Sequence, residues 1–292
     1  TTPTTVQNLP PVQNLTPLQQ SMHQKLISAR FRHLNQTLYT TPSTTSLSLF
    51  TSNPQIYNDY HTGFRQQVAL WPENPVDIYI HTLSNLRKPR GRDVVIADLG
   101  CGDARIAAAM AEKKGVKVLS YDLVASAPGV IQADISSLPL PGGSVDLCIF
   151  CLALMGTNWV SFVEEANKVL RMKGEVWVAE IKSRFARRGR GRVEHSVGKK
   201  RKTTKGDDDD DDDDEEVLRT EVDGVDAPEE TDVGPFIDVF RRRGFTLKEG
   251  SVDLRNKMFV RMEFIKTGLP STGDVDPDEE RKVLKPCLYK TR

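Results

Sequence analysis

The first third of the chain carries apolar residues at helical spacing among many polar ones. Residues 57–70 predict a helix that Pro72 and Pro75 terminate, and residues 76–86 predict another, with Pro75 at its first position. The Ser/Thr-rich residues 40–54 predict a loop, and residues 1–17, rich in Thr, Pro, Gln and Asn, predict disorder. Between them, an amphipathic helix is predicted by the apolar residues Leu18, Met22, Leu26, Ile27, Leu34 and Leu38. We therefore expect a disordered and helical extension over residues 1–54.

Short apolar runs alternate with helical segments from residue 94 onward. The runs predict strands at residues 94–97, 117–121, 130–133, 145–150 and 175–181, and the segments between them predict helices at 104–113 and 159–170. A further helix at 236–243 precedes two predicted strands, 245–254 and 258–265, which residues 255–257 join as an antiparallel hairpin. This alternation predicts an α/β fold: a seven-stranded, mostly parallel sheet with helices on both faces.

The charged residues are strongly segregated, although 40 basic and 40 acidic residues give a net charge of zero. Residues 182–205 are basic and residues 207–216 are wholly acidic, with almost nothing to bury. We expect a disordered insertion at 183–232 within a domain spanning 55–270, followed by a tail at 271–292. The basic block could contact RNA phosphates, act as a nuclear localisation signal, or be neutralised by the acidic run. The acidic run could bind basic proteins.

A glycine-rich turn follows the first predicted strand. In Asp98-Leu99-Gly100-Cys101-Gly102-Asp103, the glycines allow a sharp turn and a close backbone approach to a ligand. Arg105 stands where a dinucleotide fingerprint needs its third glycine, so a pyrophosphate cradle is incomplete. S-adenosylmethionine has no phosphate, and Asp98 or Asp103 could bind its ammonium group. A purely structural turn is the alternative.

Polar residues after the next strands fit the rest of this cofactor. Asp122 stands 22 residues after Gly100, the spacing at which a carboxylate accepts hydrogen bonds from ribose hydroxyls. Asp134 could accept the adenine amino group while Ile135 packs on the ring, although Asp134 could equally be a helix N-cap. Cys151 follows the fourth strand and should face the same cleft.

The cysteines and the hydropathy pattern exclude other classes. Cys148 and Cys151 have C-x-x-C spacing but lie in a predicted strand, and no second ligand pair supports a metal site. We expect reduced thiols. No stretch is long and apolar enough for a transmembrane helix, so no membrane partner is expected.

Several runs resemble the ribosomal RNA-processing protein 8 family. They are Tyr60-His61-x-Gly63-Phe64-Arg65-x-Gln67-Val68, Trp71-Pro72-x-Asn74-Pro75-Val76-Asp77, Ala97-Asp98-Leu99-Gly100-Cys101-Gly102-Asp103, Phe150-Cys151-Leu152-Ala153-Leu154-Met155-Gly156-Thr157-Asn158, Glu164-Glu165-Ala166-Asn167 and Lys257-Met258-Phe259. The resemblance covers about residues 55–182 and 233–270. It implies a Rossmann-like class I methyltransferase that uses S-adenosylmethionine and methylates N1 of an adenine in large-subunit ribosomal RNA. The nucleus and nucleolus, and the pre-ribosome as partner, are implied with it.

The same resemblance implies which residues contact the cofactor: His61, Gly100, Asp122, Asp134, Ile135 and Cys151. His61 alone would indicate only a packed or surface histidine. The Asn/Asp-Pro-Pro-aromatic motif of many amino-methyltransferases is absent after the fourth strand, which weakens exocyclic amine methylation. No catalytic residue is predicted, because adenine N1 has a free lone pair and positioning can supply most of the acceleration.

Two other functions are compatible with these sequence patterns. One is a cofactor-sensing protein in chromatin or ribosomal DNA silencing, with a methyltransferase fold and no methyl transfer to RNA. The other is a nicotinamide-dependent oxidoreductase, against which Arg105 argues because the third glycine is missing.

Overall fold

The computed structural model describes residues 16–86, 91–187, 231–271 and 276–289. In this part of the chain, seven strands form one sheet in the order β3-β2-β1-β4-β5-β9-β8. Strands β1 to β5 are parallel, whereas β9 runs antiparallel to both of its neighbours. The predicted mostly parallel sheet is confirmed. Its strands are Val94–Leu99 (β1), Val116–Asp122 (β2), Val130–Gln132 (β3), Val145–Cys151 (β4), Leu170–Ile181 (β5), Phe245–Leu247 (β8) and Phe259–Lys266 (β9).

Helices cover both faces of the sheet, because successive residues of a buried strand point to opposite sides. Ile149 of β4 belongs to an apolar cluster with α4 (Pro75–Ser84) and α5 (Arg105–Met110). The next residue, Phe150, belongs to the cluster on the other face, formed with α6 (Trp159–Val169) and α7 (Gly234–Arg242).

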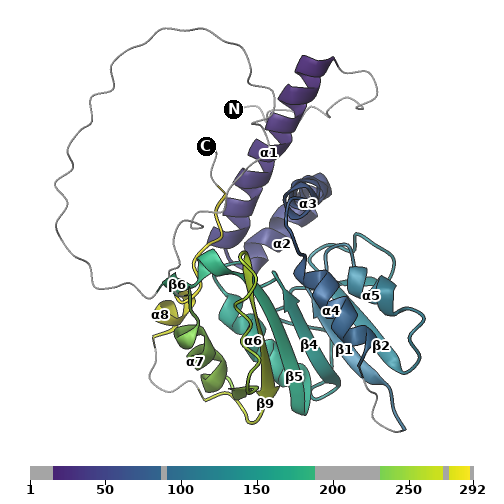
Figure 1. The fold of residues 1–292 in the computed structure, drawn as a ribbon, viewed down its shortest axis with the longest axis vertical. Helices are drawn as coiled ribbons and strands as arrows, with labels where there is room; N and C mark the ends of the chain where they lie inside the picture. Colours follow the sequence, from purple (N-terminus) through teal and green to yellow (C-terminus); the bar gives the residue numbers. More distant parts are fainter. Residues whose placement is uncertain (1–15, 87–90, 188–230, 272–275, 290–292) are drawn as a thin grey trace, which may run out of the picture.

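Three further helices lie together at one end of the sheet (Figure 1). They are α1 (Pro17–Thr40), α2 (Ser43–Ser52) and α3 (Pro54–Val68), and we call them the cap. The prediction of a loop at 40–54 was wrong, since α2 occupies most of it. Ser and Thr favour helices weakly, but Ser46 and Phe50, four positions apart, are both buried, and this packing outweighs propensity.

The C-terminal segment joins the cap to the domain. It contains the short helix α8 (Pro277–Arg281), and Leu284, Cys287 and Tyr289 beyond it are buried. The side-chain amide of Asn35 in α1 donates to the carbonyl of Cys287, with 2.6 Å between nitrogen and oxygen. Residues predicted to form a polar tail therefore pack against α1, the first helix of the structure.

The edge of the sheet differs from its prediction. Strand β8 ends at Leu247, so residues 248–258, and not a three-residue turn, connect it to β9. The hydroxyl of Ser251 donates to the carbonyl of Lys248 and closes a turn there, and Asp253 forms an isolated bridge with Arg261. This turn interrupts the apolar run that the sequence presented as one strand.

The residues after β5 form two short elements at the border of the charged segment. A 3-10 helix spans Lys182–Arg184, and β6 (Ala186–Arg187) pairs with β7 (Thr231–Asp232). Most of the insertion expected at 183–232 lies outside the described residues, as do residues 1–15. Within the described residues, no helix is long and apolar enough to cross a membrane.

Candidate active site

The turn after β1 brings the backbone close to two walls of a cavity. Gly100 and Gly102 have φ of +76° and +54°, a region that side chains with a Cβ rarely adopt. The amide of Gly100 donates to the carbonyl of Tyr121, with 2.8 Å between nitrogen and oxygen. A Cβ at Gly100 would lie 2.7 Å from the Cβ of Ala153, and one at Gly102 would lie 3.2 Å from Cε1 of His61. Gly100 is therefore required by conformation and by space.

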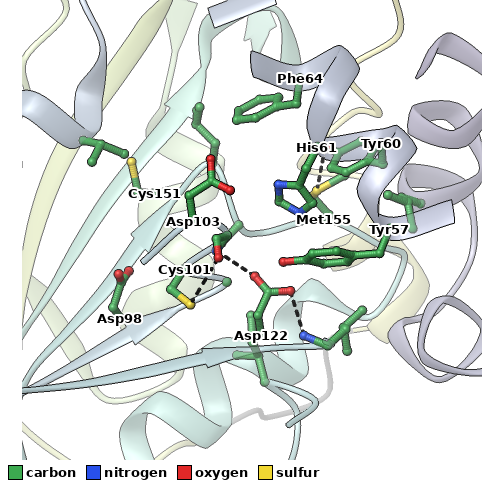
Figure 2. Close-up of a pocket in the computed structure, with 18 of the residues that line it drawn as sticks. Tyr57, Tyr60, His61, Phe64, Asp98, Cys101, Asp103, Asp122, Cys151 and Met155 are labelled. Atoms are coloured by element: carbon green, nitrogen blue, oxygen red, sulfur yellow. Dashed lines mark hydrogen bonds between the residues drawn. The ribbon is translucent and has the colours of Figure 1, made fainter. Parts of the chain in front are cut away.

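Asp122 ends β2 beside this turn and is almost fully buried. Its Oδ2 accepts from the amide of Gly102 and its Oδ1 from the amide of Leu123, each over 2.8 Å from nitrogen (Figure 2). A carboxylate has about four lone-pair sites, so the group can still accept hydroxyl donors. Burial raises the pKa of Asp122, and the neighbouring His61 lowers it in part.

Asp98 and Asp103, both candidates for a bound ammonium group, have opposite surroundings. Asp103 is half-exposed and forms an ion pair with Arg65, with 2.9 Å between Nη1 and Oδ1. Asp98 is 3% exposed, lines the cavity, and accepts no hydrogen bond from the described residues. Burial raises the pKa of Asp98 from 3.8 to about 7, and the charge of Asp122 adds to the shift. A cationic ligand group would stabilise the Asp98 carboxylate, whereas Asp103 already has a partner.

Asp134 and Ile135 follow β3, and both line the same cavity. The Oδ1 atom of Asp134 accepts from the amide and the hydroxyl of Ser136, each at 2.8 Å. This is a turn within a loop and no helix begins here, so the N-cap interpretation of Asp134 was wrong. The loop holds the carboxylate and the buried side chain of Ile135 at the edge of the cavity.

His61 and Cys151 reach the cavity from opposite sides (Figure 2). His61 lies on α3, and its ring packs against that of Tyr57 with 4.2 Å between centroids. Burial lowers the pKa of His61, which keeps its imidazole neutral at pH 7. Burial raises the pKa of Cys151, which remains a thiol. Cys148 packs in the cluster on the other face of the sheet, so the two cysteines do not form one site.

One cavity of about 440 Å³ is lined by all six residues that the sequence predicted to contact the cofactor: His61, Gly100, Asp122, Asp134, Ile135 and Cys151. The sequence did not show that the cap forms its other wall, because no local pattern links residues 38–69 to the strand ends. The cap, its linker to α4 and the first turn of α4 contribute Leu38, Ser43, Ser46, Phe50, Tyr57, Tyr60, His61, Phe64, Arg65, Val68, Ala69, Asn74 and Val76.

The sheet order, the single antiparallel strand and the cavity at the carboxyl ends of β1 to β4 define a Rossmann-like class I methyltransferase fold. A family model described as "hypothetical methyltransferase" matches residues 17–202. The chain therefore belongs to this family, and its relatives include proteins named ribosomal RNA-processing protein 8 and 25S rRNA (adenine-N1)-methyltransferase. The family expected from the sequence is confirmed.

Three relatives illustrate the similarity. The 25S rRNA (adenine-N1)-methyltransferase of Chaetomium thermophilum is 42% identical, over 97% of this chain and 62% of its own length. The 25S rRNA (adenine(645)-N1)-methyltransferase of Schizosaccharomyces pombe is 39% identical, over 95% of this chain and 73% of its own length. Ribosomal RNA-processing protein 8 of Dictyostelium discoideum is 46% identical, over 95% of this chain and 60% of its own length. The chain thus spans about three fifths to three quarters of the length of these relatives.

Proposed function

We propose that this protein is an S-adenosylmethionine-dependent methyltransferase that modifies N1 of an adenine in large-subunit ribosomal RNA. The observation that carries the proposal is the convergence of Gly100, Asp122, Asp134 and Cys151 on one cavity in a chain of this family. A volume of about 440 Å³ lies within the range of cofactor pockets. Relatives named for methylation of adenine N1 in 25S rRNA support the choice of substrate.

The chemical character of the cavity fits the cofactor. S-adenosylmethionine carries an ammonium group and a sulfonium, and the unpaired Asp98 carboxylate offers a buried counter-charge for them. Asp122 would accept the ribose hydroxyls, and Asp134 with Ile135 would hold the adenine ring. His61 and Cys151 would border the amino-acid part, where a neutral imidazole and a neutral thiol add no repulsive charge.

The protein's own part in the reaction is positioning. When bound, S-adenosylmethionine supplies an electrophilic methyl group, which the free lone pair of adenine N1 can accept without a general base. The cap forms one wall of the cavity over the strand ends, and the glycine turn fixes another. N1 lies on the Watson–Crick edge of adenine, so the target base must be unpaired or flipped out of its helix.

The substrate implies the cellular setting that we propose, the pre-ribosome in the nucleus and nucleolus. The blocks at 182–205 and 207–216 lie mostly outside the described residues. Contact of the basic block with RNA, and of the acidic run with basic proteins, therefore stay proposals from the sequence alone.

Calorimetric titration of S-adenosylmethionine into the protein tests the cofactor site. The Asp122→Ala variant should bind at least tenfold more weakly than the wild type, because a hydrogen bond to a charged group contributes about 1.5–3 kcal/mol. Asp278→Ala, which alters an exposed carboxylate on α8, is the control and should bind normally. Thermal unfolding of each variant separates lost binding from lost structure. Absence of binding by the folded wild type would refute the proposal that the protein is a methyltransferase. Binding without methyl transfer to ribosomal RNA would favour a cofactor-sensing role in silencing.

A further inference from the structure

The cavity extends beyond the residues that we assign to the cofactor. Asp122 ends β2 and Asp134 follows β3, both on one side of β1 in the sheet, whereas Cys151 ends β4 on its other side. The lining continues from Cys151 to the start of α4, at its N-cap Asn74 and at Val76 in its first turn. We call this part, beside β4 and the linker, the distal chamber.

Apolar side chains that line the same cavity suit a flat, apolar ring. Val76 shares an apolar cluster with Cys151, and Phe64 shares another with Met155. Phe64 is only partly buried, and its ring lies parallel to that of Tyr60, with 6.1 Å between centroids and 12° between planes. Aromatic and aliphatic walls of this kind hold a nucleobase through stacking, whatever its identity. A polar group is needed to distinguish one base from another.

Asn74 is the amide in this chamber, and its orientation is fixed. Its Oδ1 accepts from the amide of Val76 over 3.0 Å and caps α4. No described residue accepts a hydrogen bond from its Nδ2, although the side chain lines the cavity. The neighbouring Glu73 accepts from Asn256 over 2.8 Å, and Arg105 holds Asp77 in the first turn of α4 through an ion pair. The linker is thus anchored on both sides of Asn74.

The free donor and the half-used acceptor of Asn74 match one edge of adenine. Adenine presents the N6 amino donor beside the N7 acceptor, and an asparagine amide can bind both at once. The carbonyl oxygen has two lone pairs, so capping of α4 leaves one for N6. Guanine presents two acceptors, O6 and N7, at the same edge and could not satisfy Oδ1.

We propose that the distal chamber is the subsite of the target base and that Asn74 selects adenine through its N6 and N7 atoms. This inference rests on the proposed function and names the recognition step within it. Binding of this edge leaves the adjacent N1 atom unobstructed and exposed to the methyl donor. The role of the missing Asn/Asp-Pro-Pro-aromatic motif is then partly filled by an Asn-Pro pair, Asn74 and Pro75, from a different element.

Atomic substitution in the RNA tests the contact directly. Synthetic RNA carries either adenosine or 7-deazaadenosine at the mapped methylation position, and single-turnover rates are measured at saturating S-adenosylmethionine. Replacement of adenosine by 7-deazaadenosine should slow the wild type about tenfold more than it slows the Asn74→Ser variant. Serine retains an oxygen for capping α4 but has no amide donor. The 7-deaza substitution changes the intrinsic reactivity of N1 equally for both proteins. Comparison of the two rate losses therefore cancels this change in reactivity.

Three measurements make the outcome decisive. S-adenosylmethionine affinity should stay within about twofold in Asn74→Ser, since a hydrogen bond to the cofactor would contribute more. Asn85→Ser, at the other end of α4 and outside the cavity, is the matched control and should respond to 7-deazaadenosine as the wild type does. Asn74→Asp, which also caps the helix, replaces the serine variant if that one unfolds. An equal 7-deaza effect in wild type and Asn74 variants overturns the subsite, whereas absence of any transfer by the wild type overturns the proposed function instead.

Discussion

The buried Asp98 carboxylate should make cofactor affinity and protein stability respond to pH in opposite ways. Its pKa in the folded, ligand-free protein is about 7, compared with 3.8 ordinarily, mainly because burial disfavours the charged form. The folded protein therefore binds this proton more tightly than the unfolded chain does. Between pH 4 and 7 the free energy of unfolding contributed by Asp98 falls as the pH rises. Binding of a cation requires the ionised form, so affinity rises over the upper part of the same range.

The magnitudes follow from the displaced pKa. A shift of about three units corresponds to about 4 kcal/mol, an upper limit on the cost of the ionised group above pH 7. At pH 6 about nine tenths of Asp98 is protonated in the free protein, so cofactor affinity should be about eightfold weaker than at pH 7.5. Asp98→Asn removes the titration, and it should bind the cofactor more weakly than wild type at pH 7.5 while unfolding less readily.

Calorimetry at several pH values and urea unfolding measure both effects. The neutral-to-cationic titration of His61 and that of the cofactor's own amino group occur with either protein, so the ratio of wild-type to Asp98→Asn affinity isolates Asp98. This ratio should rise about eightfold from pH 6 to 7.5. A ratio that is constant with pH, or an Asp98→Asn variant that is less stable than wild type at pH 8, would refute the reasoning.

Two further predictions concern a buried ion pair beside the Tyr39 ring of α1 and the contact that holds α2. Glu180→Gln should lower the free energy of unfolding by about 3–5 kcal/mol, because it leaves the fully buried Arg184 guanidinium without its counter-charge. In urea unfolding, the Glu180→Met/Arg184→Met double variant should recover part of this loss. Asn158→Ala should lower the free energy of unfolding by about 1–3 kcal/mol, because its amide makes two hydrogen bonds of 2.8 Å to Ser43 at the start of α2, and a normal melting temperature would contradict this.

The sequence predicted the parts of the site that depend on local pattern. A strand, a glycine turn and a helix in succession are visible in residues 94–113, and the acidic residues Asp122 and Asp134 stand at strand ends. Since the carboxyl ends of parallel strands meet at one edge of a sheet, these residues had to come together. His61 could be placed there only through the family resemblance, because its position on α3 carries no local signal.

The remaining features depend on contacts between distant segments. The cap is fixed by Ser43 with Asn158, 115 positions apart, and by Asn35 with Cys287, 252 positions apart. Neither pair leaves a mark on the hydropathy pattern, and a Ser/Thr-rich stretch such as α2 favours a loop when its neighbours are unknown. The difference between Asp98 and Asp103 likewise required the structure, because it lies in the burial of Asp98 and in the ion pair of Asp103 with Arg65.

The loop after β4 is bound both to the end of β5 and to the cap. The amide of Leu154 donates to Glu180 and its carbonyl accepts from Arg184, over 2.9 Å and 2.7 Å, so the loop is bound to the end of β5. Gly156 has a φ of +87°, and a Cβ there would lie 3.1 Å from the carbonyl oxygen of Thr41 between α1 and α2.

One short segment thus meets three demands at once: it continues a core strand, bounds the cavity and anchors the cap. Cys151 and Met155 line the cavity, while Asn158 holds α2. A substitution in this loop must therefore fit the sheet, the cap and the cavity, which contact successive residues of it. The same loop couples the cap to the strand ends. Weakening the Asn158 contact should therefore loosen the cavity wall formed by Tyr57 and His61, as well as lower the stability of the protein.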